Sequence, residues 1–387
     1  MNNQFKLLFL MLITSAIGNT QVKEIFKKSY ETNDLESIYL HLNGTYVEFS
    51  LSEDDKVHFD YKIEFENYSK KEIENKLNEI KIEALIKDDV LEFKTGGSEV
   101  KSDISYSLET LYGITFEGDF INFKEKTNRE FRKSKQYFLD INSSSRGKSL
   151  KEFLKKYSEV DKQGNKRKIN TKNVKILKTK FFIKLPPEIK LRVMTENSNL
   201  IFKNDVKNQL VVNARTTKLK FQNIQNPFNV FDVVNGSLRA NFLEGGKYKF
   251  THVDEVQVAQ LKKVDVDTEF SDIKVGEIGE NVEIVDFNSK FWIHNFSNDF
   301  GTLVMNTEYS EINLFFPENM KYFIETYGNN TVHYMNGVTT EIPPSRKNER
   351  SKMMLIGEKT NPNKIKINIT NGIIRFGEDF IDFGDRE

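Results

Sequence analysis

Short segments of alternating apolar and polar residues recur along the chain from about Val174 onward. Neighbouring segments lie roughly 8–12 residues apart, which is the spacing of strands in an all-β sandwich, barrel or solenoid. Their connectors are rich in Asn, Asp, Gly and Ser, which tolerate tight turns and left-handed backbone conformations. The pattern therefore predicts an all-β fold here. The segments are "LIF" at 200, "LVV" at 210, "KLKF" at 218, "SLRANF" at 237, "YKF" at 248, "VQVAQL" at 256, "VDVDTEF" at 264, "DIKV" at 272, "VEIVDF" at 282, "KFWI" at 290, "TLVM" at 302 and "INLFF" at 312.

The segment "VDVDTEF" at 264–270 shows how such a strand is expected to lie. Alternation assigns its residues to two faces. The inward face is predicted to hold Val264, Val266, Thr268 and Phe270, and the outward face Asp265, Asp267 and Glu269. In a β-solenoid each rung buries its inward residues against the rungs above and below. The core is predicted to include Val193, Leu200, Val212, Val266, Ile284, Leu303, Leu314 and Ile324. An antiparallel two-sheet sandwich fits the same alternation and is the alternative fold.

Two distant stretches of the chain repeat each other. Residues 187–201, "PEIKLRVMTENSNLI", match 317–332, "PENMKYFIETYGNNTV", with one extra residue at Asn319. The matched pairs are Pro187 with Pro317, Lys190 with Lys321, Val193 with Ile324, Thr195 with Thr326 and Asn199 with Asn330. A weaker copy is "KIKINITNGIIRF" at 364–376. Copies this far apart indicate that the same structural unit occurs near each end of a repeating array.

Two segments have helical rather than strand spacing. "KKEIENKLNEIKIEALI" at 70–86 predicts a single helix, and "KSLKEFLKKYSEV" at 148–160 a second one, followed by the polar stretch 161–173. The predicted organisation is a signal peptide at 1–18, an N-terminal β segment with one helix at 19–99, a basic loop and helix insertion at 100–175, and a repetitive β-solenoid at 176–387.

The repeated strand and turn units resemble a known family, the bacterial exported adhesin-like β-solenoid domains of the auto-transporter adhesin head type. The resemblance is carried by "FFIKLPPEIKLRVMTENSNLIF" at 181–202, "NTEYSEINLFFPENMKYFIETYGNN" at 306–330 and "ITNGIIRF" at 369–376, and more faintly by residues 30–95. Many corners that are Gly in the family are Asn, Asp or Lys here, and 100–175 has no counterpart. The resemblance implies a right-handed coil of short parallel strands, a structural or adhesive role, and no catalytic residues.

The first residues have the form of a secretory signal peptide. Lys6 precedes an apolar run from Leu7 to Ile13, and Ala16 and Gly18 occupy the −3 and −1 positions of a cleavage site. The run is shorter than the ~20 residues of a membrane-spanning helix, so no membrane-spanning segment is expected. The protein is predicted to be exported to the periplasm or the cell exterior. It contains no Cys, which excludes disulfides and an acylated cysteine anchor.

The charge of the chain is balanced as a whole but uneven along its length. Lys and Arg number 57, as do Asp and Glu, so no nucleic-acid partner is expected. Residues 124–180 nevertheless hold about 19 basic and about 6 acidic residues. This basic segment is a candidate site for an anionic partner such as a cell-envelope polysaccharide, but docking on the acidic body of its own chain, or a solvated surface, is favoured. The candidate patch is Lys133, Lys135, Lys166, Arg167 and Lys168.

Residue patterns that carry chemistry are few. The five His residues are isolated, and neither a nucleophile elbow nor a phosphate-binding loop occurs, so no catalytic, cofactor-binding or metal-binding residue is assigned and no cofactor is expected. Alternating carboxylates such as Asp265 and Asp267 suit Ca²⁺ or polysaccharide cleavage, but a solvated face screened by Lys262 and Lys263 is favoured. Trp292, beside Phe291, suits sugar stacking, but packing in the core or across strands is favoured.

Three functional hypotheses follow. The favoured one is a non-enzymatic, structural or adhesin-like β-solenoid of the cell envelope. The alternative is a carbohydrate-active solenoid enzyme that uses outward carboxylates, and the third is a scaffold or sensor that binds a protein through an exposed end of the coil. The oligomeric state does not follow from the sequence.

Overall fold

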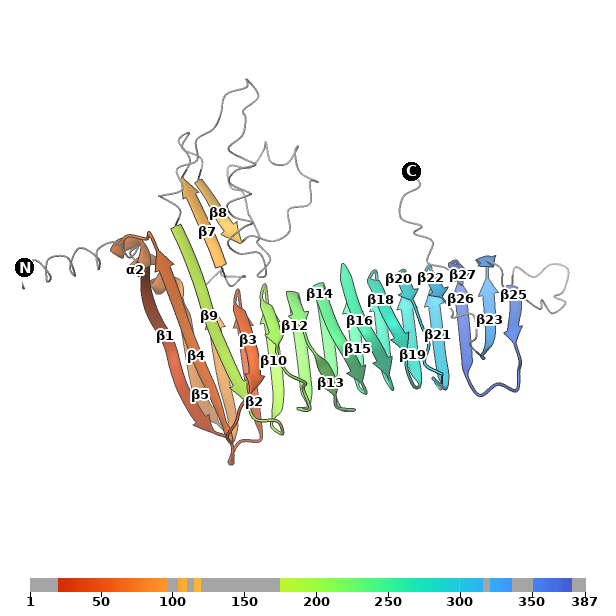
Figure 1. The fold of residues 1–387 in the computed structure, drawn as a ribbon, viewed down its shortest axis with the longest axis horizontal. Helices are drawn as coiled ribbons and strands as arrows, with labels where there is room; N and C mark the ends of the chain where they lie inside the picture. The colour runs from red at the N-terminus through yellow and green to blue at the C-terminus, as the bar shows by residue number, and fades with distance from the viewer. Residues whose placement is uncertain are drawn as a thin grey trace, which may run out of the picture.

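Almost every described residue of the computed structural model lies in or next to a β-strand. The structure describes residues 20–96, 104–109, 115–119, 175–298, 300–315, 321–335 and 351–377. These residues form 27 strands that are hydrogen-bonded into one sheet, and a single helix. Figure 1 shows an elongated array in which successive strands lie side by side from the N-terminal to the C-terminal end. The predicted all-β class is therefore confirmed.

A first parallel ladder runs along the array. Its strands, in order of pairing, are β6 (Val90–Gly96), β2 (Ser37–Asn43), β10 (Lys190–Glu196), β12 (Leu210–Lys220), β14 (Val230–Glu244), β15 (Lys247–Thr251), β17 (Asp265–Glu269), β19 (Val282–Phe287), β21 (Thr302–Glu308), β26 (Lys364–Thr370) and β23 (Phe323–Asn329). Tyr248, Val266 and Ile284 are in register on three of these strands, so equivalent residues form a column across the ladder.

A second parallel ladder follows the first after a corner. It consists of β9 (Lys175–Leu185), β3 (Tyr46–Leu51), β11 (Asn199–Phe202), the later parts of β12 and β14, β16 (Glu255–Lys262), β18 (Asp272–Ile278), β20 (Lys290–Ile293), β22 (Glu311–Phe315), β27 (Ile373–Gly377) and β24 (Val332–Met335). The short β13 (Asn223–Gln225) pairs with the end of β14. One strand of each ladder and the corner between them are called a rung below.

Among the described strands, antiparallel pairing is confined to the two ends of the array. At the N-terminal end it joins β1 (Thr20–Glu31), β4 (Lys56–Glu66) and β9, β5 (Lys81–Lys87) and β6, and β7 (Ile104–Glu109) with β8 (Thr115–Asp119) and β9. At the other end β25 (Ser351–Gly357) pairs with β23. The strands from β10 to β22 pair in parallel, which excludes the antiparallel sandwich for this region.

The core lies between the inward faces of the two ladders. Each of the eight residues predicted to point inward is at most 5% exposed, and all belong to one hydrophobic cluster that contains residues of both ladders. Alternation along each strand was sufficient to identify them, because the side-chain period of two is a local property of the backbone.

The corner between the ladders has the same backbone conformation on every rung. One residue adopts a left-handed conformation, with φ between 50° and 63°, and its N–H donates to the carbonyl of the next rung in most cases. The residues at this position are Gly44, Asn197, Thr216, Asn235, His252, Phe270, Asn288, Tyr309, Asn371 and Asn330. A buried Ser or Thr follows on several rungs, and the hydroxyls of Ser198, Thr217, Ser271 and Ser310 each donate to the carbonyl two residues earlier.

The corner explains one wrong prediction. Phe270 was assigned to the inward face with Val264 and Val266, but its side chain is 43% exposed. The strict alternation ends at Glu269, because the left-handed residue turns the chain and directs its own side chain outward.

The register of the long sequence repeat is also corrected. Inter-strand pairing places Val193 in the column of Val212, Tyr248, Met305, Ile367 and Thr326, and not in the column of Ile324. The two matched stretches are both strand, corner and strand, but they are offset by two residues. An offset of two keeps every side chain on its face, so a comparison of apolar positions alone does not detect it.

The helix and insertion predictions are corrected as well. The helix α2 covers Lys70–Glu79, capped by Ser69, and the rest of the predicted helix is strand β5. Strands β7 and β8 lie within the segment that was assigned to a loop and helix insertion, and β7 pairs with β9. The predicted helix at 148–160 and the signal peptide at 1–18 lie outside the described residues.

Thr216 provides a direct test of the corner. It is an exposed, β-branched residue in the left-handed region (φ 51°), between corners that are Asn197 and Asn235. Replacing Thr216 by Asn is expected to raise the free energy of unfolding by about 1 kcal/mol, because the strain of the left-handed conformation is relieved. Urea unfolding followed by fluorescence of the single Trp measures it. Thr251→Asn, in a regular strand, is the control and should give no gain.

Candidate ligand-binding groove

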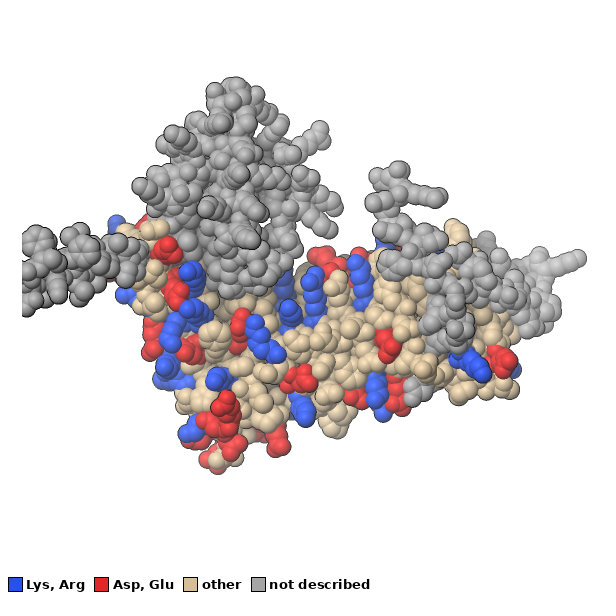
Figure 2. All heavy atoms as spheres, in the orientation of Figure 1, with Lys and Arg blue, Asp and Glu red and all other residues tan. Residues whose placement is uncertain are grey.

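A column of polar and aromatic residues lies on the outward face of the second ladder. Lys220, Arg239, Gln257, Lys274 and Trp292 occupy equivalent positions on β12, β14, β16, β18 and β20, each in register with the next. Their side chains face away from the core because the residues on either side, such as Ile273 and Val275, are buried. Figure 2 shows Lys and Arg side chains gathered side by side along the upper part of the central array.

Four residues of this column, Lys220, Arg239, Gln257 and Lys274, line a groove of about 400 Å³. Ala259 and Gly276 occupy the next outward position on two adjacent strands, and Asn241 and His294 line the groove on the flanking strands. A Cβ at Gly276 would lie 2.6 Å from the carbonyl oxygen of Ala259, so this position requires glycine. The groove exists because the outward residues in the middle, Ala259 and Gly276, are small, whereas those on either side, Asn241 and His294, are larger.

The cations of the groove differ in how they are paired. Arg239 forms an ion pair with Glu255, with 2.7 Å between Nη2 and Oε2. Lys220 has no ion pair with any residue that the structure describes. The Lys274 ammonium lies 5.6 Å from the centroid of the Trp292 ring, close enough for a cation–π interaction. Two of the three cations thus have no carboxylate partner of their own among the described residues.

His294 adds a neutral ring to the groove. Its imidazole stacks on Phe315, with 5.3 Å between ring centroids. Burial, and secondly the charge of Lys274, lower the pKa of His294. The imidazole is therefore uncharged at neutral pH, and the positive charge of the groove resides on the Lys and Arg side chains.

The residues selected from the sequence lie elsewhere or have different surroundings. Lys133, Lys135, Lys166, Arg167 and Lys168 are outside the described residues. Phe291 is fully buried in the core, whereas Trp292 faces outward and packs across strands against Lys274. The interpretation of Trp292 as a cross-strand residue therefore holds, and the core interpretation does not.

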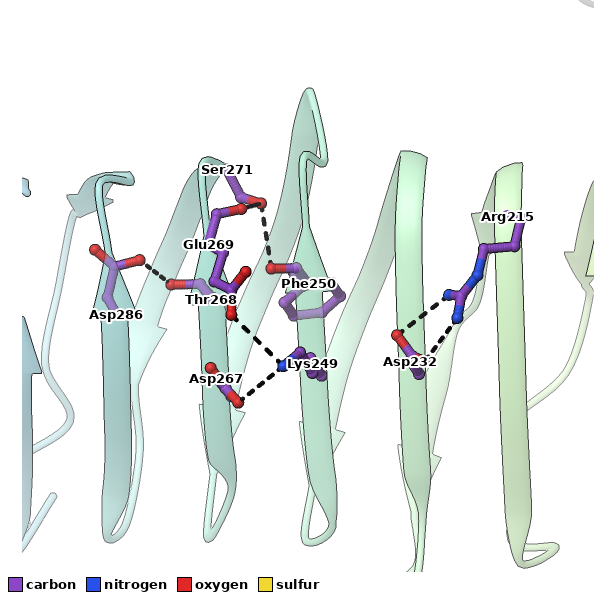
Figure 3. A network of polar contacts seen from close by, with 9 residues as sticks. All are labelled: Arg215, Asp232, Lys249, Phe250, Asp267, Thr268, Glu269, Ser271 and Asp286. Atoms are coloured by element: carbon purple, nitrogen blue, oxygen red, sulfur yellow. Dashed lines mark hydrogen bonds and ion pairs between the residues drawn. The ribbon is translucent and has the colours of Figure 1, made fainter.

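The carboxylates considered for catalysis lie on the first ladder. Asp267 and Glu269 each come within 3.6 Å of the Lys249 ammonium on the preceding rung (Figure 3). Lys262 and Lys263 were expected to screen them, but these pair with Glu244 and Glu280. The screening cation is Lys249 on the neighbouring strand. It lies in register with Asp267, and residues in register on adjacent strands are close together.

Sequence reasoning did not select Lys220, Arg239 or Lys274. Each is an ordinary outward residue of an alternating segment. Only the register of the strands brings the three cations into one column. The one feature of the sequence that could have indicated the groove is the pair of small outward residues, Ala259 and Gly276, on successive rungs.

Within the described parts of the chain, no group of three or more His, Asp or Glu side chains is placed to hold a metal ion. Over the same residues, no helix has the length and apolar character needed to cross a membrane.

Comparison with known proteins yields only weak similarities. No family model matches the chain, and no curated protein matches it. A crystal structure of a "putative cell adhesion protein" from Clostridium sporogenes is 12% identical, covering 94% of this chain and 100% of its own, with a TM-score of 0.17. A "putative lipid binding protein" from Parabacteroides distasonis is 10% identical, covering 93% and 98%, with a TM-score of 0.28. Scores this low carry no argument about fold or function.

Proposed function

We propose that the protein is an exported, non-enzymatic, adhesin-like β-solenoid that binds an anionic polysaccharide in the groove of its second ladder. The observation that carries the proposal is the column of Lys220, Arg239 and Lys274 beside the groove. Two parallel ladders that share a corner on each rung support the solenoid form, and the predicted signal peptide supports export. The right-handedness of the coil is part of the proposal.

A linear polyanion fits this column better than a compact anion does. Neighbouring strands are about 4.8 Å apart, so Arg239 and Lys274, two strands apart, present charges roughly 10 Å apart along the array. A chain that follows the array axis meets successive cations, and the half-buried, outward-facing ring of Trp292 suits stacking of a sugar ring. Uronate-containing polysaccharides combine both features.

Binding to polygalacturonate tests the proposal. The double variant Lys220→Gln, Lys274→Gln is expected to weaken binding about tenfold, because two exposed charge contacts are each worth up to about 1 kcal/mol. Affinity electrophoresis and titration calorimetry at two salt concentrations measure the change, which should be smaller at high salt.

The matched control is Lys247→Gln, Lys366→Gln, which removes the same charge from the outward face of the first ladder. Equal weakening by both double variants would indicate nonspecific attraction and contradict the groove as the site. Absence of binding by the unmodified protein to any polyuronate would contradict the choice of ligand.

A separate assay tests the non-enzymatic part of the proposal. Asp265 and Asp267 are examples of the outward carboxylates that a solenoid glycosidase could use, and Asp267 is paired with Lys249. Incubation with polysaccharide substrates is expected to release no reducing ends. Cleavage that disappears in the Asp265→Asn, Asp267→Asn variant would replace the adhesin-like function by the enzymatic one.

A further inference from the structure

Four aromatic side chains form a continuous row at the corner between the ladders. His252 stacks on Phe270 with 4.9 Å between centroids, Phe270 meets Phe287 at 5.4 Å, and Phe287 meets Tyr309 at 5.7 Å. We call these four residues the aromatic row. Phe270, Phe287 and Tyr309 are 43%, 40% and 51% exposed, so the row lies open on the surface of four consecutive rungs.

Three of the four residues of the aromatic row occupy positions that disfavour aromatic side chains. His252, Phe270 and Tyr309 have left-handed backbones, with φ between 51° and 58°, where most other corners have Asn or Gly. A bulky residue in this conformation costs about 1–2 kcal/mol. Contacts between rings recover part of that cost, but an Asn at each corner would avoid it and would leave no exposed apolar surface. Strain of this kind is concentrated at ligand-binding sites.

Polar side chains alternate with the rings. Phe287 lies in register between Glu269 on one neighbouring strand and Glu308 on the other, and Asn288 follows it at the corner. Glu308 is exposed and has no ion pair within the described part of the chain. Carboxylate and amide oxygens accept hydrogen bonds from hydroxyl groups. The charge of Glu269 is paired with Lys249, and that of Glu308 disfavours an anionic ligand.

We propose that the aromatic row is a second binding site, which takes a neutral glycan chain running along the array. The row is one ring wide, whereas a protein partner needs a broad apolar centre within roughly 1,000 Å² or more of interface. Sugar rings combine apolar C–H faces with hydroxyl donors, which matches rings alternating with acceptors. The site is separate from the groove, which carries cations and suits a polyanion.

Affinity electrophoresis in gels that contain laminarin, dextran, galactomannan or hydroxyethyl cellulose tests this proposal. The unmodified protein is expected to be retarded by at least one of these neutral polymers. The variant Phe270→Asn, Tyr309→Asn is expected to weaken that binding about tenfold, and it should fold, because Asn is the residue of the neighbouring corners. Its urea unfolding transition verifies that it does.

Two further variants make the result specific. Phe228→Asn removes an aromatic residue that is 68% exposed but lies outside the row, and it should leave the retardation unchanged. The groove variant Lys220→Gln, Lys274→Gln should also bind neutral polymer normally. A loss of polyanion binding in the groove can therefore be distinguished from a loss of neutral-glycan binding at the aromatic row. The inference is overturned if none of the four polymers retards the protein, or if Phe270→Asn, Tyr309→Asn binds as tightly as the unmodified chain.

Discussion

Replacing Val266 by Asp is expected to lower the free energy of unfolding by roughly 3–5 kcal/mol, the effect of an unpaired charge in the core. Val266 is 5% exposed and lies in register between the buried Tyr248 and Ile284. In the core between the ladders a carboxylate at this position would be unpaired, because Ile284 is apolar and the hydroxyls of Tyr248 and Thr268 already donate to Gly245 and Asp286. Urea unfolding followed by circular dichroism measures the loss.

Val285→Asp is the matched control for this variant. Val285 is on the neighbouring strand, β19, but it is 49% exposed on the outward face. The same change there should alter stability by no more than about 0.5 kcal/mol. Similar losses in both variants would contradict the assignment of inward and outward faces.

The second large effect is expected at Asp286, whose carboxylate is buried at the corner. It accepts hydrogen bonds from the hydroxyls of Thr268 and Ser310 and, at 3.1 Å, from the backbone N–H of Ser289, and Figure 3 shows the Thr268 contact. Asp286→Ala should destabilise the protein by about 3 kcal/mol, because it leaves the buried Thr268 hydroxyl and the Ser289 N–H without an acceptor, whereas the Ser310 hydroxyl retains the Glu308 carbonyl. Thermal and urea unfolding measure the change.

Comparison variants separate the loss of hydrogen bonds from the loss of charge. Asp286→Asn keeps one acceptor oxygen and should be less destabilising than Asp286→Ala. Asp267→Ala removes an exposed carboxylate that is paired only with Lys249 among the described residues, and it should cost at most about 1 kcal/mol. If Asp286→Ala and Asp267→Ala have equal effects, the three hydrogen bonds at the corner do not stabilise the fold.

The candidate sites could be predicted from the sequence only in part. Trp292 was recognisable as a residue suited to sugar stacking, but its neighbour Lys274 precedes it by a full rung, and only the pairing of β18 with β20 brings them together. The aromatic row is still less accessible to sequence reasoning. Phe270 reads as the last inward residue of an alternating strand, and only the left-handed corner directs it toward Phe287 and Tyr309.

Over most of the chain from Val174 onward, the sequence by itself determined the positions of the strands and the residues that face the core. Both follow from a period of two along a single extended segment, so a residue such as Ile284 is assigned without knowledge of any other strand. Which strands pair, in which direction and in which register was decided only by the tertiary structure. Met305 on β21 pairs with Ile367 on β26, while the strand β23 that lies between them in sequence is added beyond β26. Alternating segments are interchangeable in their local pattern, and packing across rungs selects among them.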